Sequence, residues 1–83
     1  MRIKLLVGSI PLSFKEENLK DMFSIYGKVL SVVIVTDIHT GHSRGFGYVE
    51  MKTQADARNA ITALNGLELN GRNIFVDQSH LND

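Results

Sequence analysis

The sequence predicts a small α+β domain in which one antiparallel sheet carries two helices on a single face. Stretches with helical spacing alternate with β-branched or alternating stretches in the order strand, helix, strand, strand, helix, strand. The 83 residues leave room for one domain only, and a hydrophobic content of 43% suffices for an ordinary core. We therefore treat residues 1–83 as one domain with its core at about 3–79.

The first predicted helix follows a short strand at the start of the chain. The apolar run at 3–8 is too short for a helix and is typical of a buried strand. Ser13 and Glu16 have the spacing of a capping box, and apolar residues then recur at helical intervals until Gly27. We therefore expect a helix at about 14–25 that Gly27 terminates.

A long hairpin is predicted in the middle of the chain. Residues 29–36 are almost entirely β-branched or apolar, a composition that packs well in a sheet. A polar connector at 37–43 separates them from an alternating stretch at 44–51. We expect 29–36 and 44–51 to pair as antiparallel strands.

The second half of the chain repeats the helix and strand pattern. Thr53 and Asp56 open a capped segment whose apolar residues share one face, so we expect a helix at about 54–64. An Asn-Gly pair at 70–71 is a type I′ turn signal, and the alternating run at 73–78 predicts the last strand. The resulting βαββαβ order is the ferredoxin-like arrangement, a four-stranded antiparallel sheet with two helices on one face.

Two helices cover one face of such a sheet, so the other face is open to water. In three strands, the face that carries charges also carries a large apolar side chain. The strand at 29–36 is apolar on both sides, and we place Val33 and Val35 outward by analogy. The residues that alternation assigns to the open face are Lys4, Leu6, Gly8, Arg44, Phe46, Tyr48, Glu50, Asn73, Phe75 and Asp77. We expect Gly45 and Gly47, on the covered face, to let a helix approach closely.

Charge and composition exclude several classes of function. Nine Lys and Arg balance nine Asp and Glu, so the net charge is zero and no long-range field attracts nucleic acid or an anionic membrane. No cysteine is present, which excludes disulfides, thiolate nucleophiles and Cys-ligated metals. The basic N-terminus has too short an apolar run for a secretory signal, and we expect it to be mature structure. His39 and His42 lack a third ligand, and we expect no metal, cofactor or catalytic residue.

Aromatic side chains on the open face indicate a nucleic-acid surface. Of the six aromatic residues, Phe46, Tyr48 and Phe75 fall on this face, beside Lys4 and Arg44. Single-stranded nucleic acid needs such a surface, because bases stack on rings and cations meet phosphates. The alternative is that these rings are ordinary strand aromatics, covered by a partner or by the C-terminal tail of the chain.

The octamer at 44–51 resembles a motif of the RNA recognition motif (RRM) family. Its sequence Arg-Gly-Phe-Gly-Tyr-Val-Glu-Met matches the family pattern at seven of eight positions, counting the unrestricted one. The run at 5–10 is similar to the hexamer motif of the family, and the resemblance extends from Ile3 to about Ser79. It implies a stand-alone RRM that binds single-stranded RNA and is not an enzyme.

The resemblance also assigns roles to individual residues. It implies that Phe46 and Tyr48 contact bases and sugars and that Arg44 pairs with phosphate. It adds Lys4 and Gln78, which stand where such domains often contact RNA.

Two positions depart from the family pattern. Leu6 stands where the family has an aromatic that stacks on a base, and Met51 replaces the last aromatic of the octamer. Met51 falls on the covered face, where a methionine adapts readily to the core. We hypothesise that Phe75, which the family places on the strand beside 3–8, compensates for Leu6.

Two other functions are weighed against RNA binding. A protein-interaction RRM would offer Leu6, Val33, Val35 and Phe75 to a peptide or to a second copy of the chain. A small hydrolase of the acylphosphatase kind would need an arginine in the loop at 8–13, where there is none. We expect a monomer of modest RNA affinity with no membrane contact, located in the cytoplasm or, in a eukaryote, also in the nucleus, and a protein partner is left open.

Overall fold

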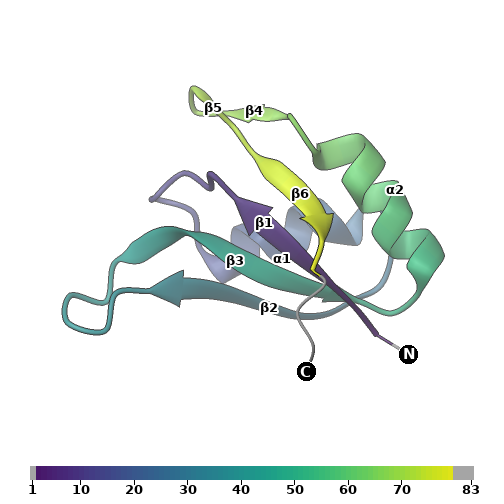
Figure 1. The fold of residues 1–83 in the computed structure, drawn as a ribbon, viewed down its shortest axis with the longest axis horizontal. Coiled ribbons are helices and arrows are strands. Elements are labelled where there is room, and N and C mark those ends of the chain that lie inside the picture. Colours follow the sequence, from purple (N-terminus) through teal and green to yellow (C-terminus); the bar gives the residue numbers. More distant parts are fainter. Residues whose placement is uncertain (1, 80–83) are drawn as a thin grey trace.

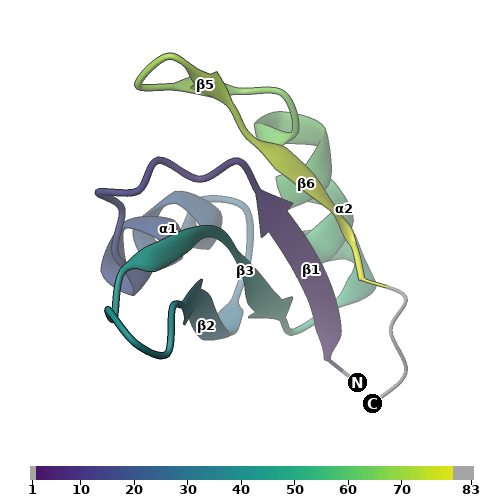
Figure 2. The same cartoon turned by 60° about the vertical axis from the view of Figure 1, so that its left-hand side comes forward.

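The computed structural model describes residues 2–79, and all structural statements below concern that range. Four strands form one antiparallel sheet in the order β2-β3-β1-β6. Their bounds are β1 Ile3–Gly8, β2 Val29–Thr36, β3 Ser43–Met51 and β6 Phe75–Gln78. Helix α1 (Glu16–Ser24) packs on β2 and β3, and α2 (Gln54–Leu64) packs on β1, β3 and β6. Figure 1 shows α1 behind the sheet, and Figure 2 shows β1 between β3 and β6. The expected ferredoxin-like βαββαβ fold is confirmed.

The core lies between the sheet and the two helices, where alternation placed it. Burial alternates along β1, β3 and β6: every second residue is buried except Ile3, Ser43 and Gln78 at strand ends, which are half-buried, and the intervening residues are exposed or half-buried. In β2, Ile34 is 7% exposed and its neighbour Val33 is 49% exposed, so the outward placement of Val33 is confirmed. The buried residues of the core are Leu5, Val7, Ile10, Leu19, Phe23, Ile34, Val49, Met51, Ala57, Ala60, Leu64, Ile74 and Val76. The C-terminal tail that was considered as a cover for the open face lies outside the described residues beyond 79.

The strand predicted at 73–78 is interrupted at Ile74. Strands β4 (Glu68–Leu69) and β5 (Arg72–Asn73) form a small hairpin, and β6 begins at Phe75 after a break at Ile74. Asn70 and Gly71 both have positive φ, +51° and +83°, as a type I′ turn requires. The predicted turn is therefore confirmed. The single strand predicted at 73–78 is wrong, because Asn73 belongs to the hairpin and β6 begins only at Phe75.

The capping box expected from Ser13 and Glu16 is wrong. Helix α1 begins at Glu16, and the Lys15 N–H donates to Asn18 Oδ1 at 2.8 Å. The Glu16 side chain turns to the sheet, where Oε2 accepts a hydrogen bond from the Ile34 N–H at 3.0 Å. The carboxylate thus satisfies a backbone donor on the edge strand β2 instead of a donor at the helix end.

Gly27 does not terminate α1 in the left-handed conformation. The helix ends at Ser24, and Gly27 is not among the glycines with positive φ. A Cβ atom at Gly27 would overlap the Asp56 side chain, whose Oδ2 accepts from the Lys28 N–H at 3.1 Å. Gly27 therefore leaves room for the Asp56 carboxylate. The cap of α2 is as expected, since Thr53 Oγ1 accepts from the Asp56 N–H at 3.1 Å.

The expected reason for Gly45 and Gly47 is also wrong, because neither admits a helix. A Cβ atom at Gly47 would overlap the Val33 carbonyl oxygen of β2. Gly45 has φ +83° and lies where the pairing of β2 and β3 shifts register, between Ile34 and Thr36. Both glycines therefore serve the close pairing and the bulge of these two strands.

Candidate nucleic-acid interface

Three rows of neighbouring side chains cross the open face of the sheet. The middle row consists of Val33, Tyr48, Leu6 and Asp77, which are paired in this order across β2, β3, β1 and β6. On one side of it lies the ring end, which comprises Phe46, Gly8 and Phe75. On the other side lies the ionic end, which comprises Arg2, Lys4, Ser31 and Glu50. The face therefore changes along the strands from aromatic to charged.

The ring end places two phenylalanines on either side of a glycine. Phe75 pairs with Gly8, and a Cβ atom at Gly8 would lie 3.7 Å from Phe75 Cβ and 3.8 Å from Phe75 Cδ2. Phe46 flanks Gly8 from the other strand, since the adjacent residues Val7 and Gly47 are paired. Phe75 is 46% exposed and Phe46 is half-buried. Gly8, which has no side chain, thus leaves its backbone uncovered between two rings that water can reach.

The middle row carries one ring between two aliphatic side chains. Leu6 and Val33 pair with Tyr48 from opposite sides. Lys4 Nζ lies 5.5 Å from the centroid of the Tyr48 ring, within the range of a cation–π interaction. Leu6 occupies the position where the family pattern has a third ring. Its pair with Asp77 lies two residue pairs along the strands from the pair of Gly8 and Phe75, on the same face.

The ionic end is held by hydrogen bonds to one carboxylate oxygen. Glu50 Oε1 accepts from Ser31 Oγ at 2.6 Å and from Arg2 Nη1 at 3.1 Å. The Ser31 hydroxyl lowers the pKa of Glu50 most, burial opposes it, and the positive charges of Arg2 and Lys4 lower the pKa further, so that the pKa stays below its ordinary value. Glu50 is therefore ionised at neutral pH. Sequence reasoning placed Glu50 on this face but missed its network, because its partners are distant in the chain.

A shallow hollow opens between the middle row and the ionic end. Its volume is about 170 Å³. It is lined by Lys4, Ser31, Val33, Tyr48 and Glu50. Such a hollow combines an aromatic surface, an aliphatic wall and a fixed negative charge.

Arg44 and Gln78 do not join the three rows. Arg44 is exposed and precedes the bulge at Gly45, next to the ring end. Gln78 pairs with the buried Leu5, and its Oε1 accepts from Gln54 Nε2 of α2 at 3.2 Å. The structure thus directs the Gln78 side chain to the covered face. Arg72 was not singled out from the sequence, yet its Nη1 donates to the Ile10 carbonyl oxygen at 3.4 Å, just beyond β1.

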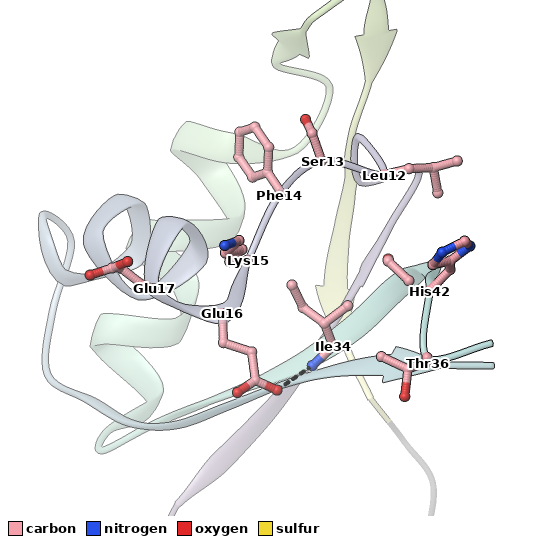
Figure 3. Close-up of a pocket in the computed structure, with 11 residues that line it drawn as sticks. Leu12, Ser13, Phe14, Lys15, Glu16, Glu17, Ile34, Thr36 and His42 are labelled. Carbon is pink, nitrogen blue, oxygen red and sulfur yellow. Dashed lines mark hydrogen bonds between the residues drawn. The ribbon is translucent and has the colours of Figure 1, made fainter. Parts of the chain in front are cut away.

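A larger cavity lies elsewhere, beside α1 and the end of β2. It has a volume of about 860 Å³ and is lined by residues 12–17, the end of β2 and residues 41–43. Figure 3 shows Leu12 and Phe14 on one side of it, His42 and Thr36 on the other, and the bond from Ile34 to Glu16 at its base. It shares no residue with the three rows of the open face.

The part of the chain that the structure describes offers neither a metal cluster nor a membrane span. Residues 2–79 contain no group of three or more His, Cys, Asp or Glu side chains that could hold a metal ion. No helix in this range is long and apolar enough to span a bilayer.

Comparison with known proteins decides the family. A family model described as RNA recognition motif matches residues 5–74. The chain belongs to the RRM family. Glycine-rich RNA-binding protein 1 of Mycosarcoma maydis is 41% identical over 80 residues, which cover 96% of this chain and 46% of that protein. The chloroplastic 31 kDa ribonucleoprotein of Nicotiana sylvestris is 43% identical over 74 residues, which cover 89% of this chain and 24% of that protein. The chain thus spans less than half the length of these relatives.

Solved RRM structures share the fold over nearly the whole chain. The RNA-binding protein PG1 superposes with a TM-score of 0.92 and 38% identity, covering 98% of both chains. The Rna15 RRM with bound RNA (GU) superposes with a TM-score of 0.85 and 30% identity, covering 96% of this chain and 85% of that one. RNA binding is thus a property that the names of these relatives and solved structures share.

Proposed function

We propose that this RRM binds single-stranded RNA on its open face, through rings aided by cations. The observation that carries the proposal is the ring end, where the exposed Phe75 and the half-buried Phe46 stand on either side of Gly8. Exposed rings on a flat sheet are costly in water and suited to stacking on bases. The proposed contact residues are Lys4, Leu6, Arg44, Phe46, Tyr48 and Phe75. The Gln78 side chain is left out because it bonds to α2.

The open face offers few cations, and this limits its affinity for RNA. The net charge is zero, and both Arg2 and Lys4 lie in the field of Glu50. Stacking contributes roughly 1–3 kcal/mol per base and does not depend on net charge. We therefore infer modest affinity that rests on two or three stacked bases. The role is one of binding, since exposed rings beside cations suit a single-stranded nucleic acid.

Titration of a short single-stranded RNA, followed by backbone amide shifts, tests the proposal. We expect shifts in β1 and β3 and an affinity that falls with salt. The double variant Phe46→Ala/Tyr48→Ala should lose about 2–4 kcal/mol of binding free energy if both rings stack. Phe14→Ala is the matched control, because it removes an aromatic ring from the large cavity on the other side of the sheet. RNA affinity equal to wild type in a folded double variant contradicts the proposal.

A protein-interaction role is the second candidate, and a specific observation favours it. Val33 and Phe75 are 49% and 46% exposed, and Leu6 lies between them on the same face. Exposed apolar side chains that adjoin one another are typical of docking surfaces. No amide response to RNA, together with self-association that depends on concentration, would favour this candidate over RNA binding.

A further inference from the structure

The hollow beside Glu50 has the features of a site that distinguishes one base from another. Both hydrogen bonds to Glu50 go to Oε1, and Oε2 accepts none from the described residues. Ser31 and Arg2 thus fix the carboxylate group by one oxygen. The second oxygen keeps its capacity to accept a hydrogen bond from a ligand.

Tyr48 lies where a base stacked on its ring would come close to the Glu50 carboxylate. Tyr48 and Glu50 lie two residues apart on one strand, so their side chains stand on the same face about 7 Å apart. Val33 and Ser31 of β2 border them on one side and Lys4 of β1 on the other. A base stacked on the Tyr48 ring within this hollow would direct one edge toward Glu50.

The chemistry of the base edges then determines the preference. Guanine presents two adjacent donors on its Watson–Crick edge, N1–H and N2–H, which a carboxylate accepts with charge-assisted bonds. Uracil presents one donor, N3–H, between two carbonyl oxygens that repel a carboxylate. Adenine and cytosine each offer an amino group and lie between these extremes.

We propose that the hollow lined by Tyr48, Val33 and Glu50 is a guanine-selective subsite in which the Glu50 carboxylate reads the base. The subsite rests on the proposed RNA binding, because the base must first stack on the open face. Ser31 is a positioning residue, since its hydroxyl donates to Glu50 Oε1 at 2.6 Å and so holds the carboxylate that reads the base.

A pair of pentanucleotides separates this inference from general RNA binding. The probes are UUUUU and UUGUU, and the dissociation constants are measured by fluorescence anisotropy. Wild type should bind UUGUU at least about fivefold more tightly, the lower end of discrimination by a good paired contact. Glu50→Gln should reduce the ratio to nearly one, because an amide donates to a uracil carbonyl and accepts from N3–H. Ser31→Ala should reduce the ratio in part.

Asp77→Asn is the matched control for the loss of a negative charge. Asp77 lies on the same face, beside Leu6 in the middle row, and outside the hollow. Its substitution should strengthen binding of both probes equally and leave the ratio unchanged. A ratio near one in wild type, or an unchanged ratio in a folded Glu50→Gln variant, overturns the subsite and leaves RNA binding standing. Wild type that binds neither probe overturns the proposed function as well.

Discussion

The ring end and the ionic end of the open face differ in how their side chains are satisfied. At the ring end, Phe46 and Phe75 stand over the Gly8 backbone with exposed apolar surface. At the ionic end, Glu50 is bonded to Ser31 and Arg2. The ring end therefore buries apolar surface when it meets a ligand, while the ionic end holds Glu50 in place through Oε1 and offers a ligand the Oε2 atom. We infer that the ring end contributes affinity and the ionic end contributes discrimination.

The same contrast explains how a chain of zero net charge can suit RNA. The cations of the ionic end act first on Glu50, whose pKa they help to lower. They add little long-range attraction, so the field around the open face stays weak. The ring end does not depend on that field.

Substitution of Gly47 should have the largest effect on stability, because this residue lies on β3 between the ring end and the middle row. It lies between Phe46 and Tyr48, and its missing side chain lets the Val33 carbonyl oxygen of β2 approach. Gly47→Ala should force the two strands apart and lower the free energy of unfolding by about 3 kcal/mol or more. Chemical denaturation measures the change.

Gly8→Ala is the control for this substitution. Its Cβ atom would meet only Phe75 atoms at 3.7–3.8 Å, an ordinary contact distance. We expect a loss within about 1 kcal/mol. Equal losses in the two variants would mean that the β2–β3 contact at Gly47 is not the reason for this glycine.

Phe75 tests whether the ring end compensates for Leu6. Phe75→Ala should cost about 1–3 kcal/mol of RNA binding, the contribution of one stacked base. Leu6→Phe should recover part of that loss, because it returns a ring to the middle row, on the same face as Phe75. Both are measured by the same RNA titration. Unchanged affinity in Phe75→Ala would show that compensation does not occur.

Alternation along the strands predicted the faces of the sheet, and the open face with them. It succeeded because residues two apart share a face whatever the partner strand is. Gln78 shows the limit of resemblance, since alternation groups it with Val76 on the covered face while the family pattern added it to the RNA contacts. The side chain follows the alternation.

What depends on partners far along the chain was not predictable in the same way. Glu16 was expected to cap its own helix, yet it bonds to Ile34, 18 residues on. The network of Glu50 joins residues 19 and 48 positions apart. Register between strands decides these contacts, and a single sequence does not display it.

Substitution of Arg44 should have a smaller effect, which is measured as a change in the salt dependence of RNA affinity. It is exposed beside the ring end and is the proposed phosphate contact. Arg44→Ala should reduce the slope of log affinity against log salt by about one, with little change in base preference. The wild-type slope should itself be shallow. A wild-type slope that implies about six or more neutralised phosphates would contradict an affinity based on stacking.

The pH dependence of stability gives the smallest effect and isolates the ionic end without any RNA. The pKa of Glu50 is lowered from its ordinary value of 4.5, first by the Ser31 hydroxyl and then by Arg2 and Lys4. A lowered pKa in the folded state means that these contacts stabilise the fold above pH 4.5 and are lost as the pH falls through the folded-state pKa. Wild type should therefore lose stability on acidification below pH 4.5 more steeply than Glu50→Gln, as measured by thermal unfolding. Asp77→Asn, which alters a carboxylate in the middle row outside the network of Ser31 and Arg2, should follow the wild-type curve. Parallel curves for wild type and Glu50→Gln would mean that the ionic end holds Glu50 too loosely to position it for a base.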